Sequence, residues 1–532
     1  MLKRVREDGH LSKEEYTVMS SQDTRSVFNP SSEGFTRATP NTLAARRMVV
    51  AQRPAKKEEF AKHIKALNAL FYDWLQREIA GNPCCDLTDG FQDYVDHVTS
   101  LEDRYLRTYG ECLTFGSGDC GQLAHGIERD EDLMVKYPRV VYSLRDKKVC
   151  GIACGGIHNA VYTETGQVYT WGCSDDGSLG RPGEESVPLL VEGLVSETVI
   201  GLACGDGQTI AVTTAGDVWG WGCYKDKEGK KWFNPSAGAS NQAKDCKKQQ
   251  DTAMKIQGIS NVVEVACGSS FNLAKCADGV LYSWGLGECG ELGRHAPPMK
   301  IKVSDDMEYD LASILRHHIT PGRMYIGNLT GGENRDALLT PVQDVKSFGC
   351  GAYHSMVAVV GDVVYSCGLN NYGQLGLGSA DTTSRDYLVE VPSLRNRGIV
   401  QLKGGMHHSL VLSSSGQMLA FGRGDSGQVG SSLKPMKNAG DFTGEPLPPD
   451  LPAHTTIVSI GCGGNHNLAL TDKSEVYSWG YGDMLALGHG KDEDERLPRK
   501  LNFSKAKINN ITITQVAGGG QHSAIVGRVV TA

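Results

Sequence analysis

Residues 166–181 of the chain read Gly-Gln-Val-Tyr-Thr-Trp-Gly-Cys-Ser-Asp-Asp-Gly-Ser-Leu-Gly-Arg. A turn opens this stretch, a short apolar strand follows, and a glycine-rich loop ends it, as in part of a β-hairpin. The same pattern recurs in six other places, at residues 111–123, 216–222, 279–294, 362–376, 416–430 and 475–488. Seven copies of one short pattern predict a radial fold built from repeated units.

The composition excludes several classes of protein. A net charge of -8 over 532 residues does not suggest a general nucleic-acid binder. No apolar run approaches the roughly 20 residues that a membrane-spanning helix needs, and no secretory signal opens the chain. A soluble intracellular protein without a membrane partner is therefore expected.

The cysteines follow the repeats. Five of the 16 occupy the same place in successive copies, just before a glycine: Cys154, Cys204, Cys267, Cys350 and Cys462. A small buried position of this kind predicts reduced structural thiols. The sequence has no Cys-x-x-Cys pair, so neither a structural zinc site nor any other metal or cofactor is expected.

Residues 1–56 are polar, lack a hydrophobic period and are predicted to form a disordered tail. Two basic clusters interrupt this tail, one at Lys3, Arg4 and Arg6 and another that begins at Arg46 and Arg47. Such clusters either keep a tail soluble or form a linear motif for an acidic groove, such as that of a nuclear import receptor.

Residues 57–106 carry two apolar stripes at helical spacing and predict a helical hairpin. Gly81-Asn82-Pro83 would end the first helix, and Asp86 or Thr88 could cap the second. The stripes consist of Phe60, Ile64, Leu67, Phe71, Trp74, Leu75 and Ile79, then of Phe91, Tyr94, Val95, Val98, Leu101 and Tyr105.

This region resembles the amino-terminal half of the fifty-kilodalton nucleoporin of the nuclear-pore basket. The resemblance rests on Ala66-Leu67-Asn68, Asp73-Trp74, Asn82-Pro83, Cys85-Asp86-Leu87-Thr88, Phe91 and Asp93-Tyr94, with Met1–Arg4 and Thr39–Arg47 in the tail. It implies that Lys3, Arg4, Arg6, Arg46 and Arg47 bind importin-alpha, and that a neighbouring part contacts the chromatin-bound exchange factor for Ran. The Phe-Gly repeats and the Ran-binding domain of that family are absent, which argues against a role in the pore barrier.

Residues 107–532 hold the repeats, each with a Gly-Gly-x-His-like turn such as Gly155-Gly156-Ile157-His158. We interpret these histidines as structural, because a ring of repeats separates them too widely for shared metal coordination. Gly-x-Gly-x-x-Gly occurs at Gly116, Gly285 and Gly422, but no helix pattern follows it, so blade turns rather than dinucleotide sites are predicted.

The repeats are similar to those of the regulator of chromosome condensation family. Tyr169–Arg181 and Leu113–Leu123 follow that family's pattern nearly residue by residue. The resemblance implies an all-β fold, a seven-bladed β-propeller. Residues 511–526 would close the ring with the strand near Glu111, which removes an open sheet edge.

Function is predicted where the repeat is interrupted, at the insertions after Trp221, after Arg294 and after Ser431. The first resembles the β-wedge that the family inserts into its GTPase, with Tyr224, Lys225 and Asp226 carrying the match. The resemblance implies nucleotide exchange on Ran without covalent chemistry. Asp119, Asp206, His407 and His522 match residues on the family's interaction face. Ser270 and Phe271 stand where exchange-active members of the family carry an aspartate and a histidine.

Two functions stay open. One is a nuclear Ran exchange factor in nucleocytoplasmic transport, with importin-alpha, chromatin and the nuclear-pore basket as further partners. The other is a non-catalytic adaptor at the pore or on chromatin, which the Ser270 replacement favours. An enzyme with covalent chemistry is disfavoured, because the sequence holds no Ser-His-Asp set outside repeated positions. A photoreceptor is disfavoured because Trp171, Trp221, Trp284 and Trp479 occupy repeat core positions.

Overall fold

The computed structural model describes residues 109–126, 130–234, 247–294, 317–327, 339–506 and 511–529. The chain divides into two compact units, Met1–Arg107 and Thr108–Ala532, and the described residues all belong to the second. The predicted tail, the helical hairpin and the five basic residues assigned to importin-alpha lie outside the described residues.

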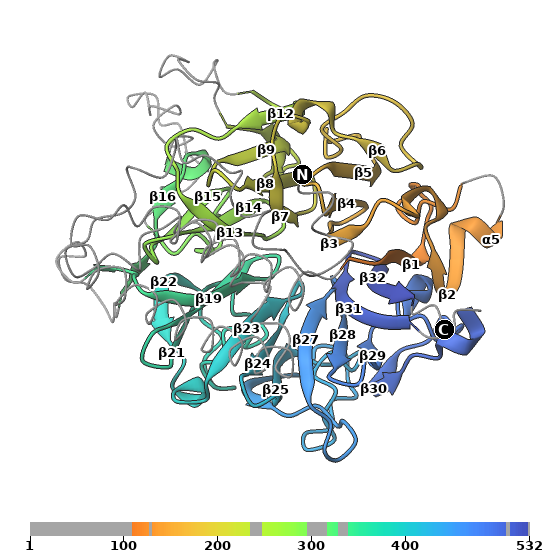
Figure 1. Cartoon of the computed structure of the whole chain (residues 1–532). Coiled ribbons are helices and arrows are strands. Elements are labelled where there is room, and N and C mark those ends of the chain that lie inside the picture. The colour runs from red at the N-terminus through yellow and green to blue at the C-terminus, as the bar shows by residue number, and fades with distance from the viewer. Residues whose placement is uncertain are drawn as a thin grey trace, which may run out of the picture. The chain divides into compact units, whose positions relative to one another are not determined.

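Seven antiparallel blades surround a common axis (Figure 1), which confirms the predicted all-β propeller. We number the blades along the chain, and blade 1 contains β3 (Val149–Cys154), β4 (His158–Thr163), β5 (Val168–Gly172) and β6 (Leu189–Leu190). Blade 2 contains β7 (Val199–Cys204), β8 (Gln208–Thr213), β9 (Val218–Gly222) and β12 (Gln250–Lys255). Blade 3 contains β13 (Val262–Cys267), β14 (Phe271–Cys276), β15 (Leu281–Gly285) and β16 (Gly322–Arg323).

Blade 4 contains β19 (Val345–Cys350), β20 (His354–Val359), β21 (Val363–Gly368) and β22 (Arg385–Glu390), and β17 (Tyr325–Ile326) and β18 (Thr340–Pro341) extend its outer edge. Blade 5 contains β23 (Ile399–Gly404), β24 (His408–Ser413), β25 (Met418–Arg423) and β26 (Phe442–Leu447). Blade 6 contains β27 (Ile457–Cys462), β28 (His466–Thr471), β29 (Val476–Gly480) and β30 (Glu495–Lys500).

Blade 7 joins the two ends of the propeller. It contains β31 (Ile511–Gly518) and β32 (His522–Val529) from the end of the chain, with β1 (Glu111–Ser117) and β2 (Met134–Val140) from its start. Strand β1 pairs with β32 from Glu111 opposite Gly527 to Gly116 opposite His522. The predicted closure of residues 511–526 on Glu111 is confirmed, and it leaves no unpaired edge where the ring begins.

The hydrophobic core lies between the blades. Trp171, Trp221, Trp284 and Trp479 are fully buried, and each apolar cluster draws residues from adjacent blades. Burying one indole contributes roughly 4–6 kcal/mol of transfer free energy, so the blade interfaces carry much of the stability. Among the described residues, no helix combines the length and the apolar character that crossing a membrane would take.

The repeated histidines are structural, as predicted, and they connect neighbouring blades through side-chain contacts. In five of the seven turns the ring Nε2 lies 2.7–2.8 Å from a polar side-chain oxygen of the following blade. The pairs are His158–Thr209, His354–Ser409, His408–Asn467, His466–Ser523 and His522–Asn159. Gln208 and Phe271 occupy the same position in blades 2 and 3, where the histidine contact is therefore missing.

Candidate protein-interaction face

One face of the propeller collects the turns that vary most. Because the strands of a blade alternate in direction, the turn between its first and second strands and the loop after its third strand emerge on the same side. We call this side the turn face. The turns between first and second strands form an inner ring, which contains Asp206. The loops after the third strands form an outer ring, which contains the first predicted insertion.

The inner turns form a closed ring of hydrogen bonds. In each turn the backbone N–H of one residue donates to a carbonyl of the next blade, over 2.7–3.1 Å. The donor and acceptor pairs are Gly156–Gly205, Asp206–Ser269, Ser269–Ala352, Ala352–Gly405, Met406–Gly464, Gly464–Gly519 and Gly520–Gly156. This ring makes a rigid rim around the axis, and Asp206 is the charged member among its seven donors.

Asp206 is held in place by blade 3. Its backbone N–H donates to the Ser269 carbonyl at 3.0 Å, and its carboxylate accepts a hydrogen bond from the Ser269 hydroxyl. The side chain reaches solvent, but the crowded turns around it remove much of its hydration and raise the pKa of its carboxyl group. The Ser269 hydrogen bond and the nearby charge of Lys225 oppose that rise.

A two-stranded hairpin replaces the usual loop after the third strand of blade 2. It consists of β10 (Tyr224–Lys225) and β11 (Lys231–Trp232). Asp226 organises its tip, because its carboxylate accepts hydrogen bonds from the backbone N–H groups of Glu228 at 3.0 Å and Lys230 at 2.8 Å. The predicted wedge is therefore an ordered hairpin beside Asp206.

Tyr224 does not face a partner, which corrects the prediction for this residue. Its side chain is 2% exposed, and its hydroxyl donates to Asn234 at 2.7 Å and accepts from the Trp284 indole N–H at 3.1 Å. In blades 1 and 2 the equivalent indole donates to a loop carbonyl instead, that of Gln122 or Ser178. The insertion removes this carbonyl before blade 3, and the phenol replaces it.

Lys225 and Lys231 share one carboxylate, that of Asp176. The Asp176 oxygens lie 2.5 Å from the Lys225 ammonium and 3.0 Å from the Lys231 ammonium. Burial acts to raise the pKa of Asp176, but both lysines outweigh it and hold the pKa below its ordinary value. The sequence alone did not single out Asp176, although the five copies that continue without an insertion at this point carry no acid there: Cys120, Cys289, Tyr372, Ser426 and Met484.

Ser270 fixes the base of the hairpin. Its hydroxyl donates to the Lys225 carbonyl at 2.9 Å and accepts from the Lys225 backbone N–H at 3.1 Å. Asp206, Lys225, Asp226 and Ser270 thus lie together where blades 2 and 3 meet.

The other predicted face residues separate into two groups. Asp119 is exposed on the loop after β1 in blade 7, and His407 is half-buried on blade 5. His522 is fully buried in the histidine relay, so its predicted role as a face residue is corrected. Burial lowers the pKa of His522 to about 3, which keeps the ring neutral.

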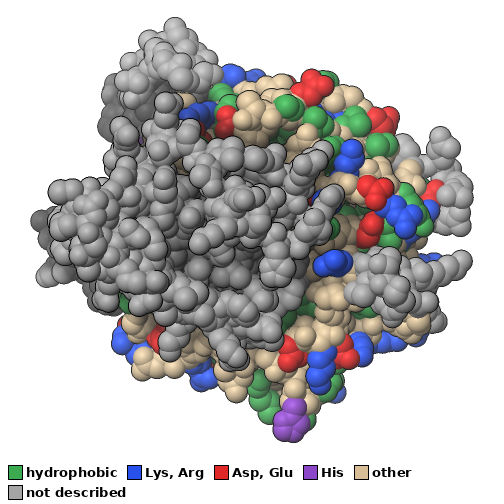
Figure 2. Space-filling view, in the orientation of Figure 1, with side chains coloured by type: hydrophobic (Ala, Val, Ile, Leu, Met, Phe, Trp, Pro, Cys, Tyr) green, Lys and Arg blue, Asp and Glu red, His purple; other side chains and the backbone are tan. Residues whose placement is uncertain are grey.

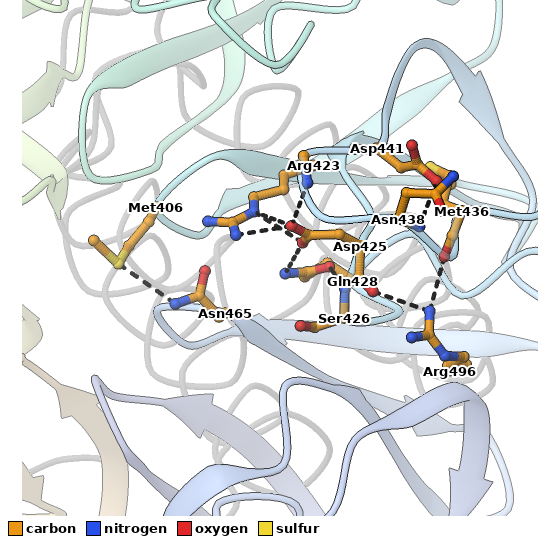
Figure 3. A network of polar contacts seen from close by, with 11 residues as sticks. Met406, Arg423, Asp425, Ser426, Gln428, Met436, Asn438, Asp441, Asn465 and Arg496 are labelled. Carbon is orange, nitrogen blue, oxygen red and sulfur yellow. Dashed lines mark hydrogen bonds and ion pairs between the residues drawn. The ribbon is translucent and has the colours of Figure 1, made fainter.

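A second polar cluster on the turn face surrounds His407. Arg423 makes a paired contact with Asp425 at 2.8–3.0 Å (Figure 3). The Arg423 guanidinium also lies over the Tyr372 ring, which packs against His407. The Asp425 carbonyl accepts from Arg496 at 2.9 Å, which ties the cluster to blade 6. This guanidinium stands where the other copies carry uncharged residues, a departure that the sequence reasoning missed.

Charged side chains of both signs lie on the described surface, and Figure 2 shows them interspersed over the part in view. The described residues hold no group of three or more histidine, cysteine or acidic side chains placed to bind a metal ion. The described residues define a seven-bladed propeller that carries a hydrogen-bonded rim and an anchored charged hairpin on one face.

Comparison with known proteins gives the family. The RCC1-like domain matches residues 111–525, and the chain belongs to this family. The human regulator of chromosome condensation is 30% identical over 440 residues, which cover 78% of this chain and 90% of that protein. The guanine nucleotide exchange factor SRM1 of Saccharomyces cerevisiae is 26% identical over 496 residues, covering 82% of this chain and 92% of that protein.

The family also contains proteins of other function. The ultraviolet-B receptor UVR8 of Arabidopsis thaliana is 29% identical over 412 residues, covering 73% of this chain and 76% of the receptor. The crystal structure of Prp20p from Saccharomyces cerevisiae, described with its binding properties to Gsp1p and histones, has a TM-score of 0.65 at 26% identity. It covers 80% of this chain and 92% of Prp20p. Membership of the family therefore establishes the scaffold.

Proposed function

We propose that the chain is a guanine-nucleotide exchange factor for the nuclear GTPase Ran, acting in nucleocytoplasmic transport and at chromatin. The observation that carries the proposal is the ordered hairpin β10–β11, which lies beside Asp206 on the rigid rim. The naming of SRM1 as an exchange factor, and of Gsp1p and histones as ligands of Prp20p, supports it.

Exchange of this kind requires no covalent step. A propeller that binds the nucleotide-free GTPase more tightly than the loaded one displaces the nucleotide and its Mg²⁺. Each tenfold acceleration of release needs about 1.4 kcal/mol of such differential binding. Asp119, Asp206 and Asp226 would supply negative charge to the basic phosphate-binding groups that the departing nucleotide leaves behind, while Lys225 and His407 would contact other parts of the GTPase.

The test is release of a fluorescent GDP analogue from purified Ran at micromolar concentrations of the full chain. We expect at least a tenfold acceleration, and a release rate equal to that of Ran alone would exclude exchange activity. The structure offers a matched pair of variants, because Lys225 and Lys255 are equally exposed and each pairs with one aspartate, at 2.5 and 2.6 Å. Lys225→Ala should slow release about tenfold, and Lys255→Ala, on the outer strand β12, should not.

A second function is favoured by Ser270. Its hydroxyl is already bonded to the Lys225 backbone, and it supplies no carboxylate where exchange-active members are expected to carry one. A propeller that binds Ran without releasing its nucleotide would be an adaptor at chromatin or at the nuclear pore. The two functions separate in one experiment, since the adaptor gives a measurable Kd for nucleotide-loaded Ran and no acceleration of release.

We also propose that the tail binds importin-alpha through Lys3, Arg4, Arg6, Arg46 and Arg47, and that residues 57–106 link the propeller to the nuclear-pore basket. The proposal rests on the sequence resemblance alone. Replacing the five basic residues by alanine should weaken importin-alpha binding at least tenfold. Binding that the five substitutions and a deletion of residues 1–106 both leave unchanged would overturn it.

A further inference from the structure

Asp176 belongs to blade 1, whereas the hairpin that it contacts belongs to blade 2. The Asp176 side chain is 14% exposed, and it lies between the ammonium groups of Lys225 and Lys231, whose side chains are 43% and 33% exposed. Lys231 also donates to the Asp175 carbonyl at 2.8 Å and to the Gln249 side chain at 3.0 Å. The loop of blade 1 and the hairpin are therefore joined by several polar contacts.

The hairpin needs this carboxylate for its own pairing. Lys225 and Lys231 are directly opposite each other in the β10–β11 register. Like charges in directly opposed positions destabilise a strand pair, and an isolated two-stranded hairpin is marginal in water even without such repulsion. Asp176 contacts both ammonium groups and cancels the repulsion between them.

The rim leaves room for Asp176 at a single turn. A Cβ atom at Gly207 would lie 3.0 Å from the nearer Asp176 oxygen, so a side chain there would displace the carboxylate. The other six turns carry a side chain at this position, which is Ile157, Ser270, Tyr353, His407, Asn465 or Gln521. An acid in the blade 1 loop and a glycine in the blade 2 turn thus occur together.

We propose that Asp176 is the positioning residue of the hairpin: it cancels the charge repulsion between Lys225 and Lys231 and fixes β10–β11 against blade 1. Asp176 thereby sets the geometry with which the hairpin meets the GTPase, and this step rests on the proposed exchange function. Asp176 acts through the hairpin and need not touch the partner.

The test measures the hairpin and the exchange reaction separately in the full chain. Asp176→Asn keeps the shape of the side chain and removes its charge. Asp175→Asn removes the same charge one residue earlier and leaves the Asp176 carboxylate and the Asp175 carbonyl in place. Backbone hydrogen exchange of peptides covering residues 224–232 reports the hairpin directly. We expect backbone hydrogen exchange in the hairpin to be about tenfold faster in D176N and to keep its wild-type rate in D175N.

Salt provides a readout that loss of packing would not change. In the wild type, backbone hydrogen exchange of the hairpin should quicken between about 50 and 500 mM KCl because salt screens the ion pairs, whereas in D176N it should slow over the same range because salt screens the remaining repulsion between Lys225 and Lys231. Nucleotide release from Ran should slow about tenfold in D176N at an unchanged melting temperature. Wild-type hairpin exchange in D176N, or equal effects of D176N and D175N, would overturn the inference. A wild type without exchange activity whose hairpin still loosens in D176N would contradict only the proposed function.

Discussion

Replacing Tyr224 with phenylalanine tests whether this residue belongs to the fold or to the partner surface. The change removes one hydroxyl and leaves the ring packed on Phe233, 5.5 Å away between centroids. It also leaves the Trp284 indole N–H and the Asn234 side-chain oxygen without this partner. A buried polar group left unsatisfied costs about 1–3 kcal/mol, so we expect Y224F to lose about 2–4 kcal/mol of stability.

The loss converts into a measurable shift in Tm. Unfolding a unit of roughly four hundred residues changes the entropy by about 0.9 kcal/mol per kelvin, so 2–4 kcal/mol corresponds to roughly 2–5 °C. Thermal melting followed by tryptophan fluorescence measures the shift. Tyr142→Phe is the matched control, because it removes the same hydroxyl from a side chain that is 67% exposed and should leave Tm within about 1 °C.

The same variant separates stability from activity. Because the Tyr224 hydroxyl points into the blade 2–3 interface, nucleotide release from Ran at about 25 °C should stay within twofold of the wild type. An unchanged Tm together with a tenfold loss of release would refute the reasoning, since it would show that Tyr224 contacts the GTPase directly.

Three further predictions concern titratable groups. Burial raises the pKa of Glu291 from 4.5 to about 7, so the wild type loses stability relative to E291Q as the pH rises through that window. E291Q should therefore melt higher than the wild type at about pH 8 and equally at about pH 4. Removal of hydration raises the pKa of Asp206, so D206N should melt higher at pH 7 while releasing nucleotide more slowly, and a lower Tm would contradict this. Burial lowers the pKa of each relay histidine from 6.5 to about 3–4, namely that of His158, His354, His408, His466 and His522. The stability of the propeller should therefore fall as the pH drops below about 6.5. Tryptophan fluorescence that stays unchanged down to pH 4 would exclude this.

The blades and their closure could be predicted because they depend on a repeated pattern. Each copy places a glycine with positive φ at the end of its third strand, for example Gly172 at 105° and Gly480 at 108°. Such a φ strains any residue with a Cβ atom, so the turn chemistry is visible in the sequence itself. The pairing of β1 with β32 follows because the last copy has too few strands of its own.

The site was less accessible to sequence reasoning, for two different reasons. His522 could have been recognised as structural, because it aligns with His158 and His466 at the position that contacts the next blade. Tyr224 could not, because its role depends on a carbonyl that is missing from a loop of another length. Asp176 was readable as a departure from the repeat within the stretch 166–181, but its two lysine partners are about fifty residues away in the sequence.

The departures at the hairpin compensate for one another, and this constrains how the site can change. Blade 2 loses the loop carbonyl that receives the indole of the next blade, and Tyr224 restores an acceptor at that point. Phe271 loses the histidine contact, and the neighbouring Ser270 bonds the hairpin backbone instead. Asp176 cancels the two lysines that the hairpin introduces, in the space that Gly207 leaves. Loss of the Tyr224 or the Ser270 contact alone would weaken the interface between blades 2 and 3, and loss of Asp176 would weaken the contact of the hairpin with blade 1. The hairpin is therefore part of the fold as well as of the proposed site, and a variant designed to alter partner binding there should keep Tyr224, Ser270 and Asp176.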